Sequence, residues 1–327
     1  MRVYGPVPSR RFGLSLGIDV VPMKRCTFDC IYCQLGASSI RCNSRQAFYP
    51  VSQIIDDVSD ALGTGPTPDV LTLAGSGEPT LYTHLGPLLD SLKALADIPT
   101  LLITNSSLLY IDDVFHAAQK ADILAPSLDA GDEATYQRIN RPHKDFDFEQ
   151  MFEGLKRSTH AHPGEVHLEV MLIDGINDDD ESLSAIAERL AQLKFDRIDI
   201  NTPVRPPMPQ RGAMPCDEAT LARAKAVFGP KAQPIADFVK RRHRQNDQRR
   251  SFSDLDKDIR EMLMRRPSTV PDIIEALSIS KNDVDQSIER LLDARMIEAR
   301  VAGKRTYYHV VGDILTLTRK SGVSPLK

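Results

Sequence analysis

The sequence predicts an α/β fold, in which a partial barrel of six βα units, open on one side, precedes a small C-terminal domain. Between about residues 14 and 205, short apolar runs of β type alternate with amphipathic stretches of helical period. Strands that alternate with helices form parallel sheets with right-handed crossovers. Near Ser251 this alternation ends, and three helical patterns precede a predicted hairpin. The 327 residues are enough for two domains.

Six apolar segments are the predicted strands of the barrel. They are Leu14–Val21, Val70–Ala74, Leu101–Thr104, Ile123–Ser127, Val166–Ile173 and Arg197–Asn201. Amphipathic stretches between them are the predicted helices. These stretches are Val51–Leu62, Leu85–Ala96, Ile111–Lys120, Phe148–Ser158 and Asp180–Leu193. In such sheets the functional residues gather at the carboxyl ends of the strands.

The C-terminal segment has the pattern of three short helices followed by a hairpin. Residues that can cap these helices are Ser253, Ser268 or Thr269, and Ser280. The runs Ile297–Val301 and Thr306–Val311 predict the two strands of the hairpin. This order resembles a winged helix-turn-helix. We therefore expect a barrel over residues 1–238, a basic linker over 239–250, a winged helix-turn-helix over 251–312 and a tail over 313–327.

The composition is typical of a soluble globular protein, with 41% hydrophobic and 26% charged residues. No apolar run reaches the ~18 residues of a transmembrane helix, and the first residues lack the apolar core of a signal peptide. We therefore expect a cytoplasmic protein with no membrane partner. The reducing cytoplasm also suits free thiols.

Three of the five cysteines, Cys26, Cys30 and Cys33, lie within eight residues. Thiolates are soft ligands that select zinc or iron–sulfur centres. Zinc normally takes four ligands, whereas three thiolates on a four-iron cubane leave one iron open to a small chelating molecule. The spacing therefore favours a 4Fe–4S cluster. A zinc site completed by Cys42 is the alternative, and a disulfide framework is disfavoured because the thiols are too close together for two independent bridges.

This CxxxCxxC arrangement, with Tyr32 directly before its last cysteine, resembles the signature of the radical S-adenosylmethionine (SAM) enzymes. The resemblance covers most of residues 1–240 and implies a radical SAM partial (β/α)6 barrel. It also implies a 4Fe–4S cluster on Cys26, Cys30 and Cys33, and SAM as the second cofactor. In this family one electron cleaves SAM to methionine and a 5′-deoxyadenosyl radical, which abstracts hydrogen from a substrate. An electron donor such as flavodoxin or ferredoxin is the implied partner.

The resemblance also implies residues that hold SAM. Residues 75–79, Gly-Ser-Gly-Glu-Pro, stand in the place of the family's Gly-Gly-Glu motif. Glu78 and the backbone near Gly77 are expected to meet the ammonium of SAM, because glycine lets the backbone approach a ligand closely. The alternative is an ordinary glycine-rich turn with a solvated glutamate.

Polar residues after the next strands complete this expected site. Asn105 and Ser127 are expected to hydrogen-bond the methionine carboxylate and the ribose, with Asp129 a weaker candidate. The alternative is that they only cap the following helices. Tyr32 is expected to pack near the adenine, and residues 174–178 resemble the loop that holds the adenine through its backbone.

The start of the chain, Tyr4–Asp19, and the run Cys30–Gly36 resemble radical SAM proteins grouped near the wyosine tRNA synthases. Those enzymes build a tricyclic base on a tRNA guanosine and hold a second cluster on cysteines that precede the motif. This chain has no cysteine before Cys26, and Cys42 and Cys216 are too few for a second three-thiolate site. We expect both to lie at the surface. The tRNA substrate is therefore an alternative reading.

The C-terminal domain does not identify its own partner. Residues 251–312 hold ten Lys and Arg against eleven Asp and Glu, whereas residues 240–250 hold six Lys and Arg against one Asp. A domain that reads a phosphate backbone should be basic. RNA and protein partners are therefore both open. A winged-helix regulator that senses iron–sulfur state or SAM is a further alternative to an enzyme.

Overall fold

The chain divides into two compact units, Met1–Arg241 and Arg242–Lys327, in this computed structural model. The structure describes residues 2–9, 11–35, 40–203, 212–235, 252–265, 267–277, 279–302 and 305–311. The predicted basic linker (239–250) and tail (313–327) lie outside these residues.

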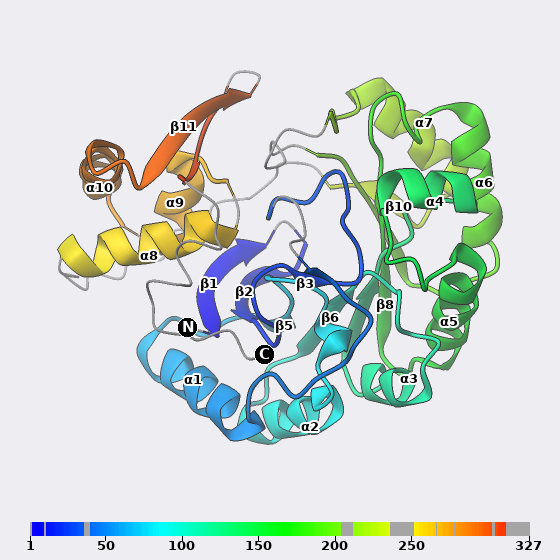
Figure 1. The fold of residues 1–327 in the computed structure, drawn as a ribbon, viewed down its shortest axis with the longest axis horizontal. Helices are drawn as coiled ribbons and strands as arrows, with labels where there is room; N and C mark the ends of the chain where they lie inside the picture. The colour runs from blue at the N-terminus through cyan, green and yellow to red at the C-terminus, as the bar shows by residue number, and fades with distance from the viewer. Residues whose placement is uncertain are drawn as a thin grey trace. The chain divides into compact units, whose positions relative to one another are not determined.

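One sheet of eight strands forms the centre of the first unit (Figure 1), in the order β1-β2-β5-β6-β7-β8-β9-β10. The strands are β1 (Val3–Ser9), β2 (Gly13–Ile18), β5 (Val70–Leu73), β6 (Thr100–Thr104), β7 (Ile123–Pro126), β8 (Glu165–Met171), β9 (Arg197–Asn201) and β10 (Ala232–Pro234). Only β1 and β2 pair antiparallel, and every other neighbouring pair is parallel. The prediction of a mostly parallel α/β sheet is confirmed. The count of six strands was too low, because β1 and β10 extend the sheet at its two edges.

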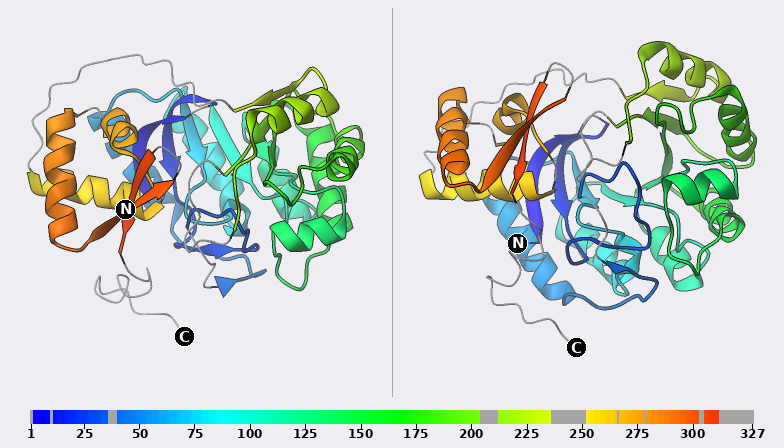
Figure 2. Two further views of the ribbon diagram at one scale, coloured as in Figure 1. Left: turned by 90° about the horizontal axis from the view of Figure 1, so that it is seen from above. Right: turned by 45° about the horizontal axis from the view of Figure 1, so that its top comes forward.

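Helices cover the outer side of this curved sheet, as both views of Figure 2 also show. They are α1 (Val51–Thr64), α2 (Leu85–Leu95), α3 (Asp112–Ala118), α4 (Glu133–Ile139), α5 (Phe148–Ala161), α6 (Asp180–Leu190) and α7 (Glu218–Phe228). Two short strands, β3 (Arg25–Cys26) and β4 (Ile40–Arg41), and the 3-10 turn η1 (Pro79–Leu81) lie in the loops. The sequence predicted α1, α2, α3, α5 and α6 but gave no bounds for α4 or α7.

Local sequence explains where several helices begin. Asp132, Asp147, Asp179 and Asp217 each precede a helix, and each side chain accepts a hydrogen bond from a backbone N–H of the first turn. Such caps satisfy donors that have no partner within the helix. Because these helices start beside the carboxyl ends of strands, the caps also fix the loops at that edge.

Apolar side chains from the outer face of the strands pack against these helices. Leu16, Leu73 and Leu168 on the strands, and Ile54 and Phe152 on the helices, are all completely buried in one cluster. This core holds the sheet in its curved form and leaves the other face of the sheet for different side chains.

The described residues of the second unit form three helices and a hairpin, in the order predicted from the sequence. These are α8 (Phe252–Arg265), α9 (Val270–Leu277), α10 (Lys281–Asp293), β11 (Ile297–Ala302) and β12 (Arg305–Val310). Ile259, Ile273 and Val284 are completely buried and join the helices. Asp256 of α8 accepts hydrogen bonds from Ser287 and from two nitrogens of Arg290 on α10. Among the described residues, no helix is both long and apolar enough to cross a bilayer.

Candidate functional site

The three clustered cysteines lie in the loop that follows β2, at the carboxyl edge of the parallel sheet. Cys26 ends the short strand β3, and the backbone N–H of Cys33 donates to the carbonyl oxygen of Cys30 at 3.1 Å. None of these three cysteines forms a disulfide, and their side chains are half-buried. The structure therefore brings them to the edge where the functional residues of such sheets gather.

Amide donors point at two of the sulfurs. The Nδ2 atom of Asn105 lies 3.5 Å from Cys26 Sγ, and the Nδ2 atom of Asn140 lies 3.6 Å from Cys30 Sγ. The backbone N–H of Phe28 is also 3.5 Å from Cys26 Sγ. N–H groups directed at sulfur stabilise thiolates and tune iron–sulfur clusters.

Burial raises the pKa of both Cys26 and Cys30 well above the ordinary value of a thiol. The charge of Glu78 raises the pKa of Cys26 further, and the neighbouring Cys26 does the same for Cys30. Thiolates in this place consequently need a cation to offset their charge, which is what bound iron provides. Donors aimed at sulfur and an environment that disfavours uncompensated thiolates together fit an iron–sulfur cluster.

Among the described residues, no three His, Cys, Asp or Glu side chains lie close enough to one point to hold a single metal ion. Three thiolates alone would also leave a zinc ion one short of its usual four protein ligands.

The turn at residues 75–79 packs directly against the cysteine loop. The backbone N–H of Glu78 donates to the carbonyl oxygen of Arg25 at 3.1 Å. A Cβ atom on Gly77 would lie 1.9 Å from that same oxygen, so only glycine fits at this position. The close backbone approach that the sequence predicted for Gly77 is thus made to the backbone of Arg25 in the cysteine loop, and its approach to SAM stays a prediction.

The carboxylate of Glu78 is buried and bound by protein donors. Its Oε1 atom accepts from the backbone N–H of Thr80 (3.1 Å), the hydroxyl of Thr80 (2.6 Å) and the hydroxyl of Thr104 (2.7 Å), and its Oε2 atom accepts from the backbone N–H of Asn105 (2.8 Å). Burial raises the pKa of Glu78, and these hydrogen bonds oppose the rise. Glu78 thus ties the end of β5 to the end of β6. Its contact with an ammonium stays a prediction.

Asn105 and Ser127 follow adjacent strands. The side chain of Asn105 donates to Thr27 at 2.8 Å and so reaches the cysteine loop. Ser127 is held by its backbone: its N–H donates to Thr104, and its carbonyl oxygen accepts from the hydroxyl of Ser106 at 2.8 Å. The structure brings Asn105 to the cysteines, and the ligand roles of both residues stay predictions.

Tyr32 is fixed by Asp129, which the sequence indicated only as a weaker candidate. The Tyr32 hydroxyl donates to Asp129 at 2.6 Å, and Asn140 and the backbone N–H of Met171 donate to the same carboxylate at 2.7 and 3.0 Å. Burial raises the pKa of Asp129 to about 6, against the effect of these hydrogen bonds. Asn140 contacts both Asp129 and Cys30, but the sequence patterns did not indicate it as a site residue. An Asn at the end of a helix is common, so its position carries no signal of a functional role.

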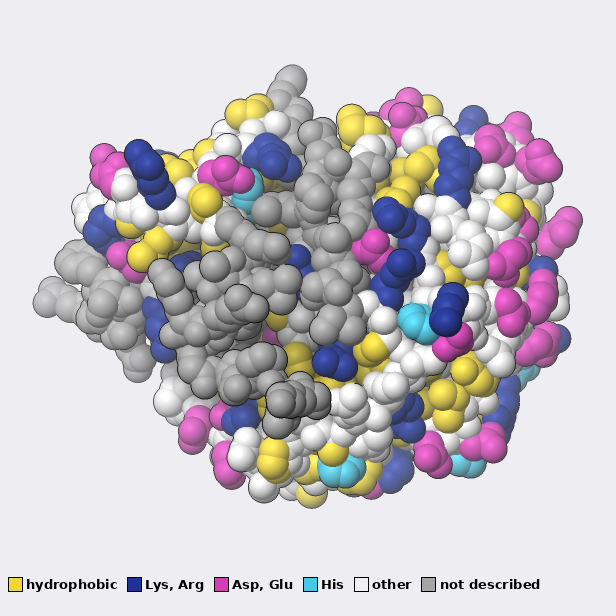
Figure 3. All heavy atoms as spheres, in the orientation of Figure 1, with side chains coloured by type: hydrophobic (Ala, Val, Ile, Leu, Met, Phe, Trp, Pro, Cys, Tyr) yellow, Lys and Arg dark blue, Asp and Glu magenta, His cyan; other side chains and the backbone are white. Residues whose placement is uncertain are grey.

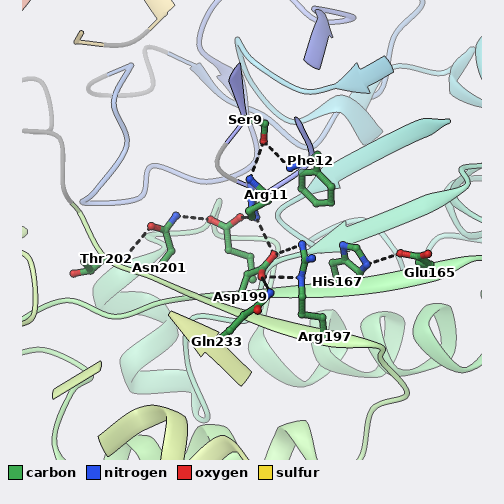
Figure 4. Close-up of polar contacts among 11 residues, drawn as sticks. Ser9, Arg11, Phe12, Glu165, His167, Arg197, Asp199, Asn201, Thr202 and Gln233 are labelled. Carbon is green, nitrogen blue, oxygen red and sulfur yellow. Dashed lines mark hydrogen bonds and ion pairs between the residues drawn. The ribbon is translucent and has the colours of Figure 1, made fainter. Parts of the chain in front are cut away.

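A polar network that the sequence patterns did not predict covers the face of β8 and β9 that points away from the helices (Figure 4). Arg11, from the turn between β1 and β2, pairs with Glu169 and lies 3.9 Å from Asp199. Arg197 also pairs with Asp199 at 2.9 Å, and Asn201 donates to Glu169 at 3.1 Å. The charges of the two arginines balance those of the two carboxylates. We call these five residues the inner wall.

The alternation of polar and apolar residues along β8 and β9 could have predicted the inner wall from the sequence. Glu169, Asp199 and Asn201 alternate with Leu168, Ile198 and Ile200, which belong to the apolar core. A period of two in a strand that is covered on one face by helices places the polar set on the other face.

The two remaining cysteines are less exposed than predicted. Cys216 is buried, with only 7% of its surface exposed, and its backbone N–H donates to the hydroxyl of Thr202 at 2.8 Å. Cys42 is half-buried, and its backbone N–H donates to the carbonyl oxygen of Cys26 at 3.0 Å because β4 pairs with β3. The prediction that Cys216 lies at the surface was wrong, since it packs into the core just before Asp217 caps α7.

Proteins of similar sequence include two UPF0026 proteins. That of Methanocaldococcus jannaschii is 38% identical over 227 residues, which cover 69% of this chain and 70% of that protein. That of Synechocystis is 33% identical over 246 residues, which cover 72% and 91%. A protein named GTPase Obg from Brachyspira hyodysenteriae is 35% identical over 309 residues. These residues make up 94% of this chain but only 45% of that protein, so this chain spans less than half the length of that relative.

A solved structure and a family model give a consistent result. A radical SAM methyltransferase from Sphaerobacter thermophilus superposes with a TM-score of 0.53 at 18% identity, over 67% of this chain and 65% of that chain, which concerns the fold alone. Residues 20–186, which include the cysteine loop, match the family model described as the radical SAM superfamily. The chain therefore belongs to the radical SAM superfamily.

Proposed function

We propose that this chain binds a 4Fe–4S cluster through Cys26, Cys30 and Cys33 and cleaves SAM reductively beside it. The observation that carries the proposal is the convergence of three thiols at the carboxyl edge of the sheet, with amide donors on two of the sulfurs. Radical SAM enzymes carry this cluster and use SAM with a reductant. When bound, the cluster supplies the electron that converts SAM to methionine and a 5′-deoxyadenosyl radical.

The chain's own residues would hold the reactants in place. Because Glu78 already accepts four hydrogen bonds, we expect it to shape the turn, whose backbone acceptors near Gly77 meet the ammonium of SAM. Asn105 and Ser127 would bind the carboxylate and the ribose. Tyr32, oriented by its hydrogen bond to Asp129, would pack on the adenine.

The inner wall is the expected boundary of the substrate pocket. Its arginines and carboxylates carry no net charge together, and most of their surface is removed from water. A low-dielectric pocket lined by paired donors and acceptors suits a polar substrate group and penalises an unpaired charge. The substrate class that this favours is polar and without net charge at the reacting end.

We also propose that the second unit is a winged helix that recruits RNA or protein. Its order of three helices and a hairpin supports this assignment. A wyosine-type modification of tRNA is the corresponding substrate hypothesis, supported by the resemblance of Tyr4–Asp19 and Cys30–Gly36 to that group. A gel shift of the intact chain with purified tRNA tests this hypothesis. Equal affinity for tRNA and for an unrelated RNA of the same length would contradict it.

Reductive cleavage of SAM is the direct test of the enzyme. The anaerobically reconstituted protein, given dithionite and SAM, is expected to release 5′-deoxyadenosine and methionine in equal amounts. Cys30→Ala protein is the matched control and should release neither. A protein with a full complement of iron that binds SAM but yields no 5′-deoxyadenosine would instead favour an iron–sulfur or SAM-sensing winged-helix regulator.

A further inference from the structure

The segment 138–145 begins in the last turn of α4 and packs on the cysteine loop, and residues next to that contact are exposed to solvent. The backbone N–H of Asp29 donates to the carbonyl oxygens of Asn140 and Arg141 at 3.0 and 3.2 Å. The side chain of Asn140 is buried and lies 3.6 Å from Cys30 Sγ, whereas the next side chain, Arg141, is 44% exposed. Adjacent residues of this segment therefore connect the cysteine site with solvent.

The exposed side chains of this segment are mainly cationic. Arg138, Arg141 and Lys144 are exposed, and so is Arg41, whose guanidinium donates to the carbonyl oxygen of Arg141 at 3.5 Å. We call these four residues the basic loop. Figure 3 shows Lys and Arg side chains gathered in a band over α4 and the segment that follows it.

Acidic neighbours neutralise the basic loop only in part. Asp29 lies 3.6 Å from the guanidinium of Arg141 but is itself buried. Asp145 is exposed, and it accepts a hydrogen bond from Asn43 and lies 3.5 Å from His143. Asp174 is also exposed, next to Gly175, whose carbonyl oxygen accepts from Arg138 at 3.4 Å. Four exposed cations against these two exposed carboxylates give this surface an excess of positive charge, which acts over about 8–10 Å in physiological salt.

We propose that the basic loop is the docking surface for an acidic protein that carries one electron, such as a small flavoprotein or ferredoxin with carboxylates around its redox centre. This inference rests on the proposed cluster at Cys26, Cys30 and Cys33. At each encounter the carrier is oxidised by one electron and the cluster is reduced by one electron. No bond forms or breaks, and no proton is transferred in this step.

Two features favour an electron carrier over RNA as the occupant. Electron transfer slows steeply with distance, so a carrier must dock where the route to the cluster is short, and here a sulfur contact and an exposed side chain are neighbours in the chain. Transient redox complexes are small and are guided by complementary charge. Four cations can contact about four phosphates, fewer than the ~6–10 contacts of proteins with strong phosphate binding.

A double charge reversal, Arg138→Glu with Lys144→Glu, tests the inference without altering Arg141 or Arg41, whose backbone or guanidinium contacts support the cysteine loop. Because the guanidinium of Arg138 donates to the carbonyl oxygen of Gly175 at 3.4 Å, Lys144→Glu alone is measured beside it as a variant that leaves residues 174–178 unaltered. The matched control reverses Lys194 and Lys225, two exposed lysines outside the basic loop, with the same change in net charge. Lys194 precedes β9, and Lys225 lies in the last turn of α7.

Binding and turnover are measured separately. The dissociation constant for oxidised flavodoxin, measured by calorimetry with the full chain, should rise by about tenfold or more in the Arg138/Lys144 variant and stay unchanged in the control. The rate of 5′-deoxyadenosine formation driven by reduced flavodoxin should fall by a similar factor at about 50 mM salt, and less at about 300 mM. With dithionite, which needs no docking surface, both variants should equal the parent protein.

These outcomes separate the docking surface from the proposed enzyme. Unchanged flavodoxin affinity in the Arg138/Lys144 variant would overturn the docking surface, whether or not SAM is cleaved. Absence of 5′-deoxyadenosine from the parent protein with dithionite would instead overturn the proposed function. Loss of tRNA affinity with unchanged flavodoxin affinity would assign the basic loop to RNA. The milder pair Arg138→Gln, Lys144→Gln should give a smaller effect of the same sign, which guards against misfolding of the first variant.

Discussion

Replacing Gly77 with alanine should disturb the cysteine loop more than any other single methyl group near the site. The added Cβ would lie 1.9 Å from the carbonyl oxygen of Arg25 and 2.8 Å from its carbonyl carbon. Both are backbone atoms, so no side-chain rotation relieves the clash. Arg25 precedes Cys26, and any shift of its carbonyl group moves the first cysteine of the site.

The expected loss of stability follows from two contributions. Overpacking against a rigid neighbour costs about 1–3 kcal/mol. The hydrogen bond from the backbone N–H of Glu78 to the same carbonyl oxygen, 3.1 Å long, is strained or lost, at a further cost of about 1 kcal/mol. We therefore expect the Gly77→Ala change to lower the free energy of unfolding by roughly 2–4 kcal/mol, together with a loss of bound iron.

Gly63→Ala is the matched control. Gly63 lies in α1, and a Cβ atom added there would have nothing within 4 Å, while alanine in a helix is favoured over glycine by about 1 kcal/mol. Urea unfolding followed by the visible absorbance of the cluster should therefore give a lower midpoint for Gly77→Ala and an equal or higher midpoint for Gly63→Ala. If Gly77→Ala protein unfolds at the same midpoint as the parent and retains its iron, the packing of this turn on the cysteine loop is wrong.

Three further changes test separate parts of the site. Glu78→Gln places an amide NH2 where a carboxylate oxygen now accepts a backbone N–H, and should lower the free energy of unfolding in urea by about 2–3 kcal/mol. The exposed residue Glu188 provides the control, because Glu188→Gln should leave that free energy unchanged. Equal unfolding midpoints for the two variants would contradict the hydrogen-bond network around Glu78. Asn140→Ala removes an N–H donor from a cluster thiolate and should make the reduction potential more negative in an EPR-monitored titration; an unchanged or higher potential would show that the donor is not directed at the cluster. Burial lowers the pKa of His162, so its neutral form favours the fold above about pH 6.5 and that stability is lost as the pH falls. His162→Leu protein should therefore lose less stability between about pH 7 and pH 5 than the parent, and an equal loss would contradict this reading.

The fold was predictable where a strand carries its own signal. The strands β5 to β7 are nearly continuous apolar runs, and β2, β8 and β9 alternate large apolar residues with polar or small ones; both patterns can be identified in a single sequence. The edge strand β1 was missed because Pro6 and Pro8 interrupt Val3–Ser9, and proline is tolerated in a sheet at such an edge. The other edge strand, β10, has three residues, too few for a pattern.

The candidate site was predictable only where its residues are close in sequence. The three cysteines fall within one loop, whereas Asn140 is 110 positions from the Cys30 sulfur that it contacts. Arg11 and Glu169 are 158 positions apart. Such pairs depend on the packing of the whole sheet. Cys216 was misplaced for the same reason, because a polar, proline-rich neighbourhood does not reveal that the side chain turns into the core.

The iron content of defined cysteine variants tests the central claim most directly. After anaerobic reconstitution, the parent protein and the double variant Cys42→Ser, Cys216→Ser should each hold about four irons and four sulfides per chain, since neither residue is expected to be a ligand. Alanine at Cys26, Cys30 or Cys33 should abolish the cluster and its visible absorbance. Zinc in place of iron in the protein isolated without oxygen, or loss of half the iron from the Cys42/Cys216 variant, would contradict the single three-thiolate cluster proposed here.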